Sequence, residues 1–477
     1  MIDRVQAKQE GIFIDEFLIK VSPDDMYLYL EVDPKNPVII KSLREKWEKI
    51  SAQLKENKII GILENPDFVD NMLIVAKGVA PKNPIPERIE LFEKFSPLLK
   101  KGKDLEEICR EVPEEEAEDL RDLCQRIICA KSEEAIGRWY PSIPGTPGAN
   151  IWGDPIDPPP LSEKPPFTLG KNLYIDEKDN LIKAKESGVV VIEKDVIEVY
   201  PEYTLKGDVD FSTGNIYFTG KKLIIQGDIK FGFKVICEGE LELQGATENK
   251  VYIDVKGSFI CEGIIRGEET QVKVKGNAQI KTVEFAIIEI EGNLTITNYL
   301  IFSKCTVYGN IIATSGKGII YGGEIKCSGN IEAKILGNDS HTPTKVFAGY
   351  NPELIEPYKK ALKEEMKIKE VLERLEQGIK LGKKLKKYGK LSEQKEKILS
   401  KLEEEAEKCY NALEKLKEEI SNLKKLIAEY KSRTIKILDK VYAGVTLGIT
   451  DLTYTLNEDK SGPFTFYLEA DKPSFKD

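Results

Sequence analysis

Val274-Lys-Gly276-Asn277-Ala278 is the clearest copy of a five-residue motif that decides the fold: apolar, variable, glycine, small or acidic, apolar. It returns as Ile290-Glu-Gly292-Asn293-Leu294 and as Val307-Tyr-Gly309-Asn310-Ile311. Between Leu205 and Ile331 the repeated glycines are Gly207, Gly227, Gly239, Gly257, Gly276, Gly292, Gly309 and Gly329. Successive glycines lie 12 to 20 residues apart. This spacing is too irregular for a helical repeat, but it is typical of short strands joined by corners of varying length.

The motif indicates a corner of a coiled chain of strands. Side chains alternate along a strand, so the apolar residues two positions before and after each glycine share one face. Glycine supplies a positive φ angle or a tight corner, and a neighbouring Asn or Asp tolerates the left-handed region. One coil cannot bury its apolar face alone, whereas stacked coils share a core.

We therefore predict a central parallel β-solenoid with these eight glycines as its structural corners. The solenoid is expected to be right-handed, because right-handed parallel crossovers dominate. Roughly seven coils fit between Gly207 and Gly337, about 4.8 Å apart. The alternative is an antiparallel sandwich with regularly spaced turns, which explains the glycine spacing less well.

The composition excludes several classes of protein. The chain has 477 residues, of which 71 are basic and 81 acidic, with a formal net charge of −10. This length predicts several domains, and an acidic chain is a poor nucleic-acid binder, because such binding depends on phosphate neutralisation. The sequence contains no secretory signal and no apolar run of about 18 residues that would span a membrane. We expect a cytoplasmic protein with no membrane span.

The eight cysteines form no CxxC pair. Cys237, Cys261 and Cys327 occupy positions that Val, Ile or Leu hold in other copies of the motif, which predicts reduced thiols buried in the solenoid core. A metal site is the alternative, but it lacks ligand spacing. Neither a metal nor a cofactor is expected.

Two regions precede the solenoid, which we assign to residues 171–350. Residues 1–140 mix strand and helix patterns and predict an α/β or α+β domain. Residues 141–170 form a connecting arm rich in Pro and Gly, which disfavour helices and central strands. We expect a linker or an arm over the first coil, with Trp152 favouring packed structure; a proline-rich docking motif is the alternative.

The region of residues 351–433 predicts a long coiled coil. Nine apolar positions alternate in steps of four and three: Leu402, Ala406, Cys409, Leu413, Leu416, Ile420, Leu423, Ile427 and Tyr430. Tyr388-Gly389-Lys390 interrupts the pattern between two arms of similar length. We predict an antiparallel helical hairpin with arms roughly 50–60 Å long, inserted before strands in residues 434–477 that complete or cap the solenoid.

Catalytic motifs are missing from the sequence. The single histidine, His341, lies in a turn-rich segment and is expected to be an ordinary loop residue. No P-loop, GxGxxG, HExxH or GxSxG motif occurs. Acidic groups such as Glu238, Glu240 and Glu242 alternate along a strand and are expected to face solvent. The alternative is a pair of carboxylates that cleave carbohydrate on a β-helix.

A family resemblance follows from the order of these motifs. The run from Tyr203 to Ile216, the later Gly322-Gly323-Glu324-Ile325 and the closing Val441-Tyr-Ala-Gly444-Val-Thr-Leu-Gly448 resemble the bacterial flagellar assembly protein A family. Val75-Ala-Lys-Gly78 and the Pro/Gly-rich segment are also similar to it. The resemblance implies a cytoplasmic bacterial protein linked to flagellar assembly through polar placement and partner binding. It implies no catalytic residues.

The predicted function is that of a non-enzymatic scaffold whose partners are other proteins, such as flagellar or polar factors. The expected contact residues lie at the hairpin tip: Leu385, Tyr388 and Leu391. A homo-oligomer is left open. The alternatives are a self-assembling cytoskeletal polymer of stacked solenoids, a carbohydrate- or polymer-modifying β-helix enzyme, and a nucleic-acid binder with a basic face.

Overall fold

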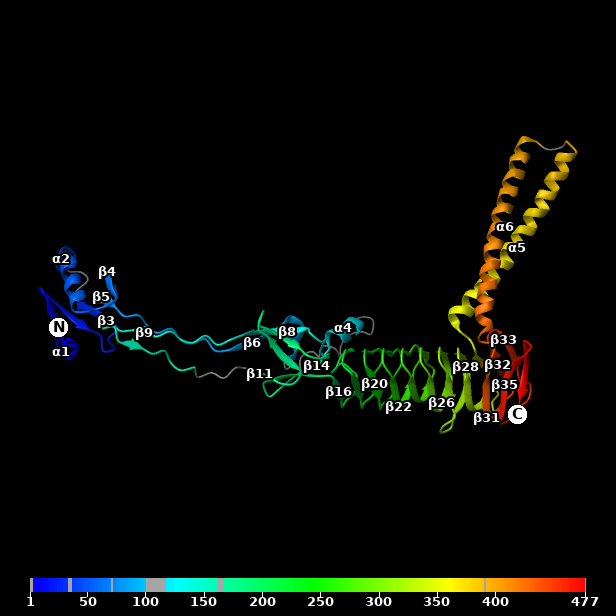
Figure 1. Cartoon of the computed structure of the whole chain (residues 1–477), viewed down its shortest axis with the longest axis horizontal. Coiled ribbons are helices and arrows are strands. Elements are labelled where there is room, and N and C mark those ends of the chain that lie inside the picture. Colours follow the sequence, from blue (N-terminus) through cyan, green and yellow to red (C-terminus); the bar gives the residue numbers. More distant parts are fainter. Residues whose placement is uncertain are drawn as a thin grey trace.

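The chain is an elongated series of parts, mainly β with some helix (Figure 1). The computed structural model describes residues 3–32, 37–69, 72–99, 117–161, 167–389 and 392–476. A small N-terminal unit stands at one end and is joined by a thin stalk to a second small β unit, which leads into the solenoid. A helical hairpin projects sideways from the far end of the solenoid, near the C-terminus.

The N-terminal unit is an antiparallel sheet with a helix on one face. The strand order is β1-β2-β3-β5-β4, with β1 (Ile12–Ile14), β2 (Phe17–Val21), β3 (Tyr27–Glu31), β4 (Ile62–Val69) and β5 (Met72–Lys77). Helix α1 (Arg4–Gln9) precedes the sheet, and α2 (Pro37–Glu56) buries Leu43, Ile50 and Leu54. The apolar stripe of α2 and the alternating strands share one core. The fold of this unit is therefore α+β.

The stalk consists of two proline-rich segments that run antiparallel. Isolated bridges pair them at every third residue: Val79 with Ala149, Lys82 with Thr146, and Ile85 with Ile143. Three residues is the period of a polyproline II helix, and proline has no N–H to donate, so the prolines fall between the bridges. The chain then turns back, and a third segment joins the stalk where β10 (Pro155–Ile156) pairs antiparallel with β9 (Gly148–Ala149). Residues 143–149 of the arm therefore run beside residues 79–85, and not over the first coil as we expected.

The second unit contains two small four-stranded sheets that share a core. One has the order β11-β15-β14-β7 and the other β12-β13-β8-β6. Their bounds are β6 (Arg88–Leu91), β7 (Cys129–Ala130), β8 (Ala135–Tyr140), β11 (Thr168–Leu169), β12 (Leu173–Asp176), β13 (Leu181–Ala184), β14 (Gly188–Glu193) and β15 (Val196–Tyr200). The 3-10 helix η1 (Glu93–Leu99) contributes Phe95 to this core. The helix α4 (Ala117–Leu123) instead packs on the first solenoid coils, where Asp122 accepts hydrogen bonds from Asn215 and Tyr217 at 2.8 Å.

Sheet membership departs here from our domain boundaries, which remain a prediction. Residues 173–200, which we assigned to the solenoid, lie in the two small sheets. The reason is a tight turn at Lys194-Asp195, where both residues have positive φ. Such a two-residue turn closes an antiparallel hairpin, so β14 and β15 cannot be successive parallel coils.

The solenoid has about 8 turns within residues 202–347, and each complete coil contributes strands to three faces. The first face contains β16 (Glu202–Leu205), β18 (Lys222–Ile225), β20 (Glu240–Leu243), β27 (Ile311–Ala313) and the first parts of β22 (Phe259–Arg266), β24 (Ala278–Glu284), β26 (Leu294–Val307), β29 (Ile331–Leu336) and β31 (Ile435–Val441). The second contains β17 (Ile216–Phe218), β19 (Lys234–Cys237), β21 (Tyr252–Val255), β23 (Gln271–Val274), β25 (Ile287–Ile290), β30 (Thr344–Ala348), β32 (Val445–Ile449) and the ends of β26 and β28 (Ile319–Cys327).

The third face is formed by isolated bridges and then by the later parts of β22, β24, β26 and β29 with the start of β28. Pairing between successive coils is parallel throughout these ladders. The inward positions form straight columns, for example Leu223, Leu241, Phe259, Ala278 and Leu294, all of which are buried. The predicted parallel β-solenoid is confirmed, and the antiparallel sandwich is excluded.

The motif glycines lie at two different corners. Gly207 and Gly227 belong to one column, which continues through Gly245. The other six, Gly239, Gly257, Gly276, Gly292, Gly309 and Gly329, form a second column in which each N–H from Gly257 onward donates to the carbonyl of the preceding glycine.

None of the eight motif glycines has a positive φ, so the left-handed geometry we allowed for does not explain them. The cause is close stacking of the coils. A Cβ on Gly276 would lie 2.4 Å from the carbonyl oxygen of Gly257, which is well inside van der Waals contact. Any larger residue would force the coils apart.

A ladder of side-chain amides follows the second glycine column. The Oδ1 of Asn277 accepts the backbone N–H of Asn293 at 2.9 Å, and Asn293 does the same for Asn310 at 2.8 Å. The ladder continues through Asn330 to the N–H of Thr434 at 2.9 Å. Asp208 and Asp228 play this role at the other corner. The Asn or Asp that follows six of the eight motif glycines therefore links one coil to the next.

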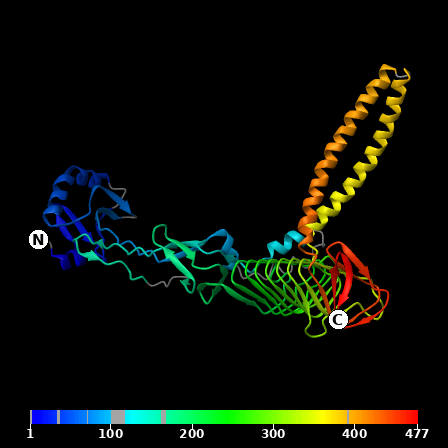
Figure 2. The same cartoon turned by 45° about the vertical axis from the view of Figure 1, so that its right-hand side comes forward.

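The hairpin interrupts the solenoid, which then resumes and is closed. After α5 (Pro352–Lys387) and α6 (Glu393–Ala428), β31 pairs in parallel with β29, and β32 with β30. The last strands, β33 (Leu452–Thr455), β34 (Lys460–Ser461), β35 (Phe464–Glu469) and β36 (Lys472–Lys476), pair antiparallel. Figure 2 shows them gathered at the end of the solenoid. The C-terminal strands thus both complete a coil and cap the column.

Candidate partner-binding hairpin

The two helices of the hairpin are of equal length and pack along an apolar seam. Each contains 36 residues, which corresponds to about 54 Å. Leu372 of α5 packs with Ala406 and Leu413 of α6, and Ile368, Leu375, Ile379 and Cys409 extend this contact. The predicted hairpin of two packed helices is confirmed. Because each helix packs mainly against its partner, most of its circumference remains available for contact with another molecule.

The base of the hairpin is anchored to the end of the solenoid. Asn351 caps α5 by accepting the N–H of Glu353 at 3.0 Å, and its Nδ2 donates to the Tyr430 hydroxyl at 3.2 Å. Tyr350 is buried beside Phe347, and its hydroxyl donates to Glu356 at 2.5 Å. Burial, then this carboxylate, raises the pKa of Tyr350 above its usual range. These contacts fix both chain segments where they leave the solenoid.

The predicted contact residues lie at the other end. Tyr388 is 75% exposed and forms the C-cap of α5, followed by Gly389 with φ +66°. Leu385 is only partly exposed, and Leu391 lies outside the described residues. The structure thus places Tyr388 exposed at the tip and Leu385 partly buried in the last turn of α5. Their role in binding remains a prediction.

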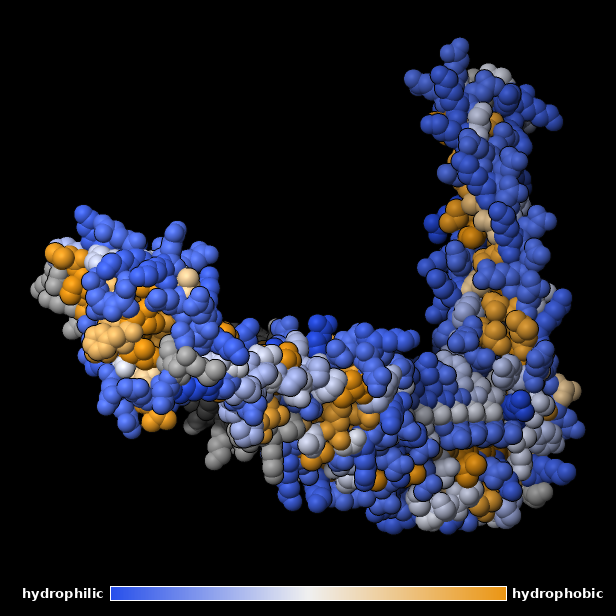
Figure 3. Space-filling view, turned by 60° about the vertical axis from the view of Figure 1, so that its left-hand side comes forward, coloured by the Kyte–Doolittle hydropathy of each residue, from blue (hydrophilic) through white to orange (hydrophobic). Residues whose placement is uncertain are grey.

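A signal that our reading of the sequence missed is the charge of the tip. Residues 377–401 contain nine lysines and two glutamates, a net +7 in a chain of net −10. We call residues 377–401 the basic tip. Among its described residues, two lysines form ion pairs: Lys383 contacts Glu403 at 3.0 Å, and Lys386 contacts Glu396 at 2.6 Å. In Figure 3 the outer end of the hairpin is strongly hydrophilic, with apolar surface lower on the arm.

A groove lies between the helices below the tip. Its volume is about 640 Å³, and its lining includes Lys380, Lys384 and Lys387 with the apolar Ile379 and Ala406. Tyr410 lines the same groove and donates to Glu376 across the pair of helices. Ala406 leaves this space because its side chain is too short to fill the seam. Since Glu376, Glu403 and Glu407 also line it, the hairpin offers an open recess of mixed charge that is partly apolar.

Two of the carboxylates that the sequence singled out on the solenoid are paired with lysines. Glu242 is paired with Lys222 at 2.8 Å and Glu238 with Lys256 at 2.9 Å, and these hydrogen bonds lower the pKa of both carboxyls. A general acid requires the opposite shift. His341 is exposed, 3.5 Å from Asp459. In the described part of the chain, no group of three or more His, Cys, Asp or Glu residues could hold a metal ion.

The cysteines of the solenoid are buried in its core. Burial raises the pKa of Cys237, Cys261 and Cys327 to about 12, so their thiols stay protonated. Among the helices described, none is long and apolar enough to cross a membrane.

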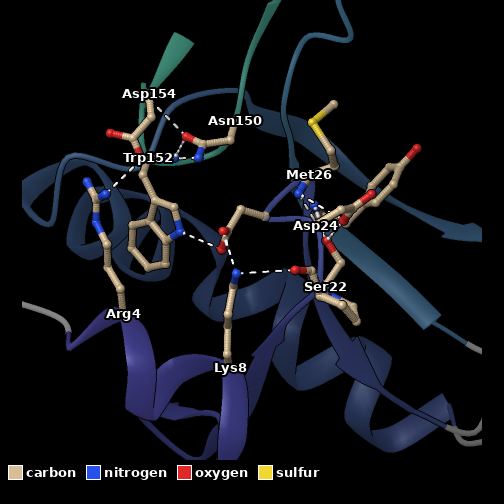
Figure 4. Close-up of polar contacts among 11 residues, drawn as sticks. Arg4, Lys8, Ser22, Asp24, Met26, Asn150, Trp152 and Asp154 are labelled. Atoms are coloured by element: carbon tan, nitrogen blue, oxygen red, sulfur yellow. Dashed lines mark hydrogen bonds and ion pairs between the residues drawn. The ribbon is translucent and has the colours of Figure 1, made fainter. Parts of the chain in front are cut away.

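The N-terminal unit carries a polar cluster that closes the stalk onto it (Figure 4). The Nε1 of Trp152 donates to Asp25 at 3.0 Å, and Lys8 of α1 approaches the same carboxylate at 2.5 Å. Arg4 pairs with Asp154 at 2.7 Å. The cluster joins α1, the turn after β2 and the returning stalk. Since its charged groups pair with one another, we interpret it as a structural clasp.

The fold and surfaces define a class of protein: a capped β-solenoid with a projecting antiparallel coiled coil. Two family models match the chain. The Flagellar Assembly Protein A beta solenoid domain matches residues 201–472, and the Flagellar Assembly Protein A N-terminal region matches residues 17–195. The chain therefore belongs to the flagellar assembly protein A family, as the sequence motifs predicted. No curated protein and no solved structure matches it.

Proposed function

We propose that this chain is a non-enzymatic scaffold of flagellar assembly that holds an acidic partner protein at the basic tip of its hairpin. Family membership supports a role related to flagella. The observation that carries the proposal is the concentration of net +7 within residues 377–401 of an otherwise acidic chain. Electrostatic complementarity raises the rate of encounter and selects partners of opposite charge.

Anchoring of the hairpin supports the same reading. The contacts of Asn351 and Tyr350 hold the base, so the tip is presented at about 54 Å from it. A fixed arm reduces the entropy that binding must overcome. The finer expectation is that the protein acts in the cytoplasm near the cell pole, which a fluorescent fusion in a flagellated source bacterium would test.

The experiment compares two triple variants of equal charge. Lys380, Lys384 and Lys387 are replaced by Glu in the first, and Lys415, Lys417 and Lys424, on the lower part of the hairpin, in the second. Capture of partners from the source bacterium is expected to fall about tenfold or more in the first variant only. Equal capture by wild type and the tip variant would contradict the proposal.

A shortened hairpin provides the second arm of the test. Residues 379–401, which contain every lysine of the basic tip, are replaced by a two-glycine turn, because Gly378 and Leu402, which then flank the turn, already lie close together. The solenoid signature in circular dichroism is expected to persist while partner capture and flagellar assembly are lost. Separate alanine variants of Leu385, Tyr388 and Leu391 test whether the apolar residues add to the charge.

The polymer alternative is less well supported. End-to-end stacking of solenoids needs free strand edges, but antiparallel strands β33–β36 cover the last coil and the two small sheets precede the first. Sedimentation at high concentration distinguishes the two functions, because the scaffold is expected to remain a small species.

A further inference from the structure

The third corner of the solenoid carries two phenylalanines in a backbone conformation that normally requires glycine. Phe285 has φ +55° and Phe302 has φ +50°. Their neighbours in the same column are Gly267 with φ +128° and Gly322 with φ +70°. A bulky residue in the left-handed region is strained, and such strain persists mainly where it has a function. Glycine occupies this column directly before and after the two phenylalanines.

The two rings lie on the surface and form a stack. Their centroids are 5.1 Å apart with an interplanar angle of 6°, and Tyr321 meets Phe302 edge-on at 5.4 Å. Phe285 is 51% exposed and Phe302 42%. Phe302 covers one face of Phe285. The position on the other side belongs to Gly267, which has no side chain, so the stack is open there.

The open side of the stack borders a hollow of about 630 Å³. Phe231 lines it in an earlier coil, and the charged groups of the lining are Glu248, Glu268, Glu284 and Arg266. Glu248 is engaged by Lys230 at 3.4 Å and by the N–H of Phe231 at 3.1 Å. Within the described part of the chain, Glu268 and Glu284 form no ion pair. The hollow is therefore acidic and has aromatic rings in its lining.

One cation–π contact already occurs on this surface, since Lys250 Nζ lies 5.4 Å from the centroid of the Phe231 ring. An arginine side chain fits the remaining space best by chemistry. Its guanidinium is planar, stacks on aromatic rings and donates in a fork to carboxylates. A lysine ammonium shares the charge but cannot continue a stack of parallel rings.

We propose that this hollow binds an arginine side chain of a partner protein, with the guanidinium stacked on the open face of Phe285 and donating to Glu268 and Glu284. The site lies on the solenoid and is independent of the hairpin. It gives the scaffold a second docking point, which binds a positively charged group, whereas the basic tip binds an acidic partner. The left-handed phenylalanines are then explained, because only an aromatic residue at that corner provides the stacking face.

The test uses the full-length protein and a labelled Gly/Ser peptide with spaced arginines, followed by fluorescence anisotropy. Phe285→Gly is expected to weaken binding about tenfold or more while the melting temperature is retained, because glycine already occupies this column in the neighbouring coils. Peptides with lysine or citrulline in place of arginine are expected to bind markedly more weakly. Equal binding of the citrulline peptide would overturn the proposal.

Two double variants that each remove two negative charges test the same proposal if Phe285→Gly fails to fold. Glu268→Gln with Glu284→Gln removes the two carboxylates of the hollow. Glu262→Gln with Glu291→Gln removes two exposed carboxylates at the other corners. Only the first pair is expected to reduce arginine-peptide binding. Equal loss in both pairs would show general attraction to an acidic chain and would overturn the site.

Discussion

The solenoid and the hairpin hold themselves together in different ways. In the solenoid, an inward residue such as Leu241 lies between equivalent residues of the coil before and the coil after it, and each backbone ladder continues through several coils. In the hairpin, Leu372 and Leu413 contact only one facing helix. Stacking makes every coil depend on its neighbours, whereas a pair of helices can open without disturbing the rest.

The largest contrast is expected from core truncation. Phe259→Ala should cost about 4 kcal/mol and loosen the coils on both sides, because it empties a fully buried column position. Leu413→Ala should cost about 2 kcal/mol and loosen only the hairpin. Hydrogen exchange resolved by segment distinguishes them. Protection lost in the solenoid of the Leu413 variant would break the comparison.

The next effect concerns the glycine column. Gly276→Ala is expected to cost about 2–3 kcal/mol, because its Cβ would lie 2.4 Å from a backbone oxygen of the coil below. Gly207→Ala is the matched control, since no atom lies within 4 Å of the Cβ position there. Denaturant midpoints measure both. Similar losses would mean that stacking does not explain the column.

Alkaline pH should weaken the solenoid through its buried thiols. The unfolded chain ionises Cys237 near pH 9, but the folded chain keeps it protonated to about 12. Between these values the unfolded state binds fewer protons, so stability falls as pH rises, by about 1.4 kcal/mol per pH unit for one thiol. Cys237→Val should flatten this slope, since Val255 occupies the same position in the next coil. An unchanged dependence of stability on pH in this variant would show that Cys237 does not cause the loss of stability at alkaline pH.

A smaller effect is expected from the amide ladder. Asn293→Ala removes the acceptor of the Asn310 N–H and should cost about 1 kcal/mol, because the groups are near solvent. Asn293→Asp keeps the oxygen, as Asp228 does at the other corner, and should be nearly neutral. A loss of equal size in both variants would place the effect in the donor Nδ2 instead.

The smallest effect is expected at the tip of the hairpin. Lys386→Gln breaks an exposed ion pair with Glu396, and such pairs contribute little to stability. The denaturation midpoint should not change measurably. A clear loss would show that the tip is held by its charges, and it would weaken the contrast with the solenoid.

The features that the sequence predicted are those with a regular period. The recurring motif around Gly276 and Gly309 indicated parallel coils because only stacked coils bury such apolar pairs. The alternation of four and three from Leu402 to Tyr430 indicated a helix pair because it places one apolar stripe along each helix. Both patterns depend on neighbours that are close in sequence or repeat at known intervals.

Other features depend on the corner of the solenoid at which a residue lies. The residues next to it in the sequence do not determine that corner. The same five-residue motif serves two corners, so Gly227 and Gly276 looked equivalent but lie in different columns. The sequence did not predict the positive φ angles of Phe285 and Phe302, because these angles follow from the way the coils stack. The lysines near Tyr388 were readable in the sequence, but their meaning depends on where the tip lies.

The insertion point of the hairpin has a mechanical consequence. Asn330 accepts the N–H of Thr434, so the chain leaves and re-enters the column beside the same rung, and Asn351 ties the two exits together through Tyr430. A lateral pull on the far end acts on this narrow base as on a lever. The torque therefore acts on the two neighbouring coils that hold the base of the hairpin. A force on the tip strains the capped end of the solenoid.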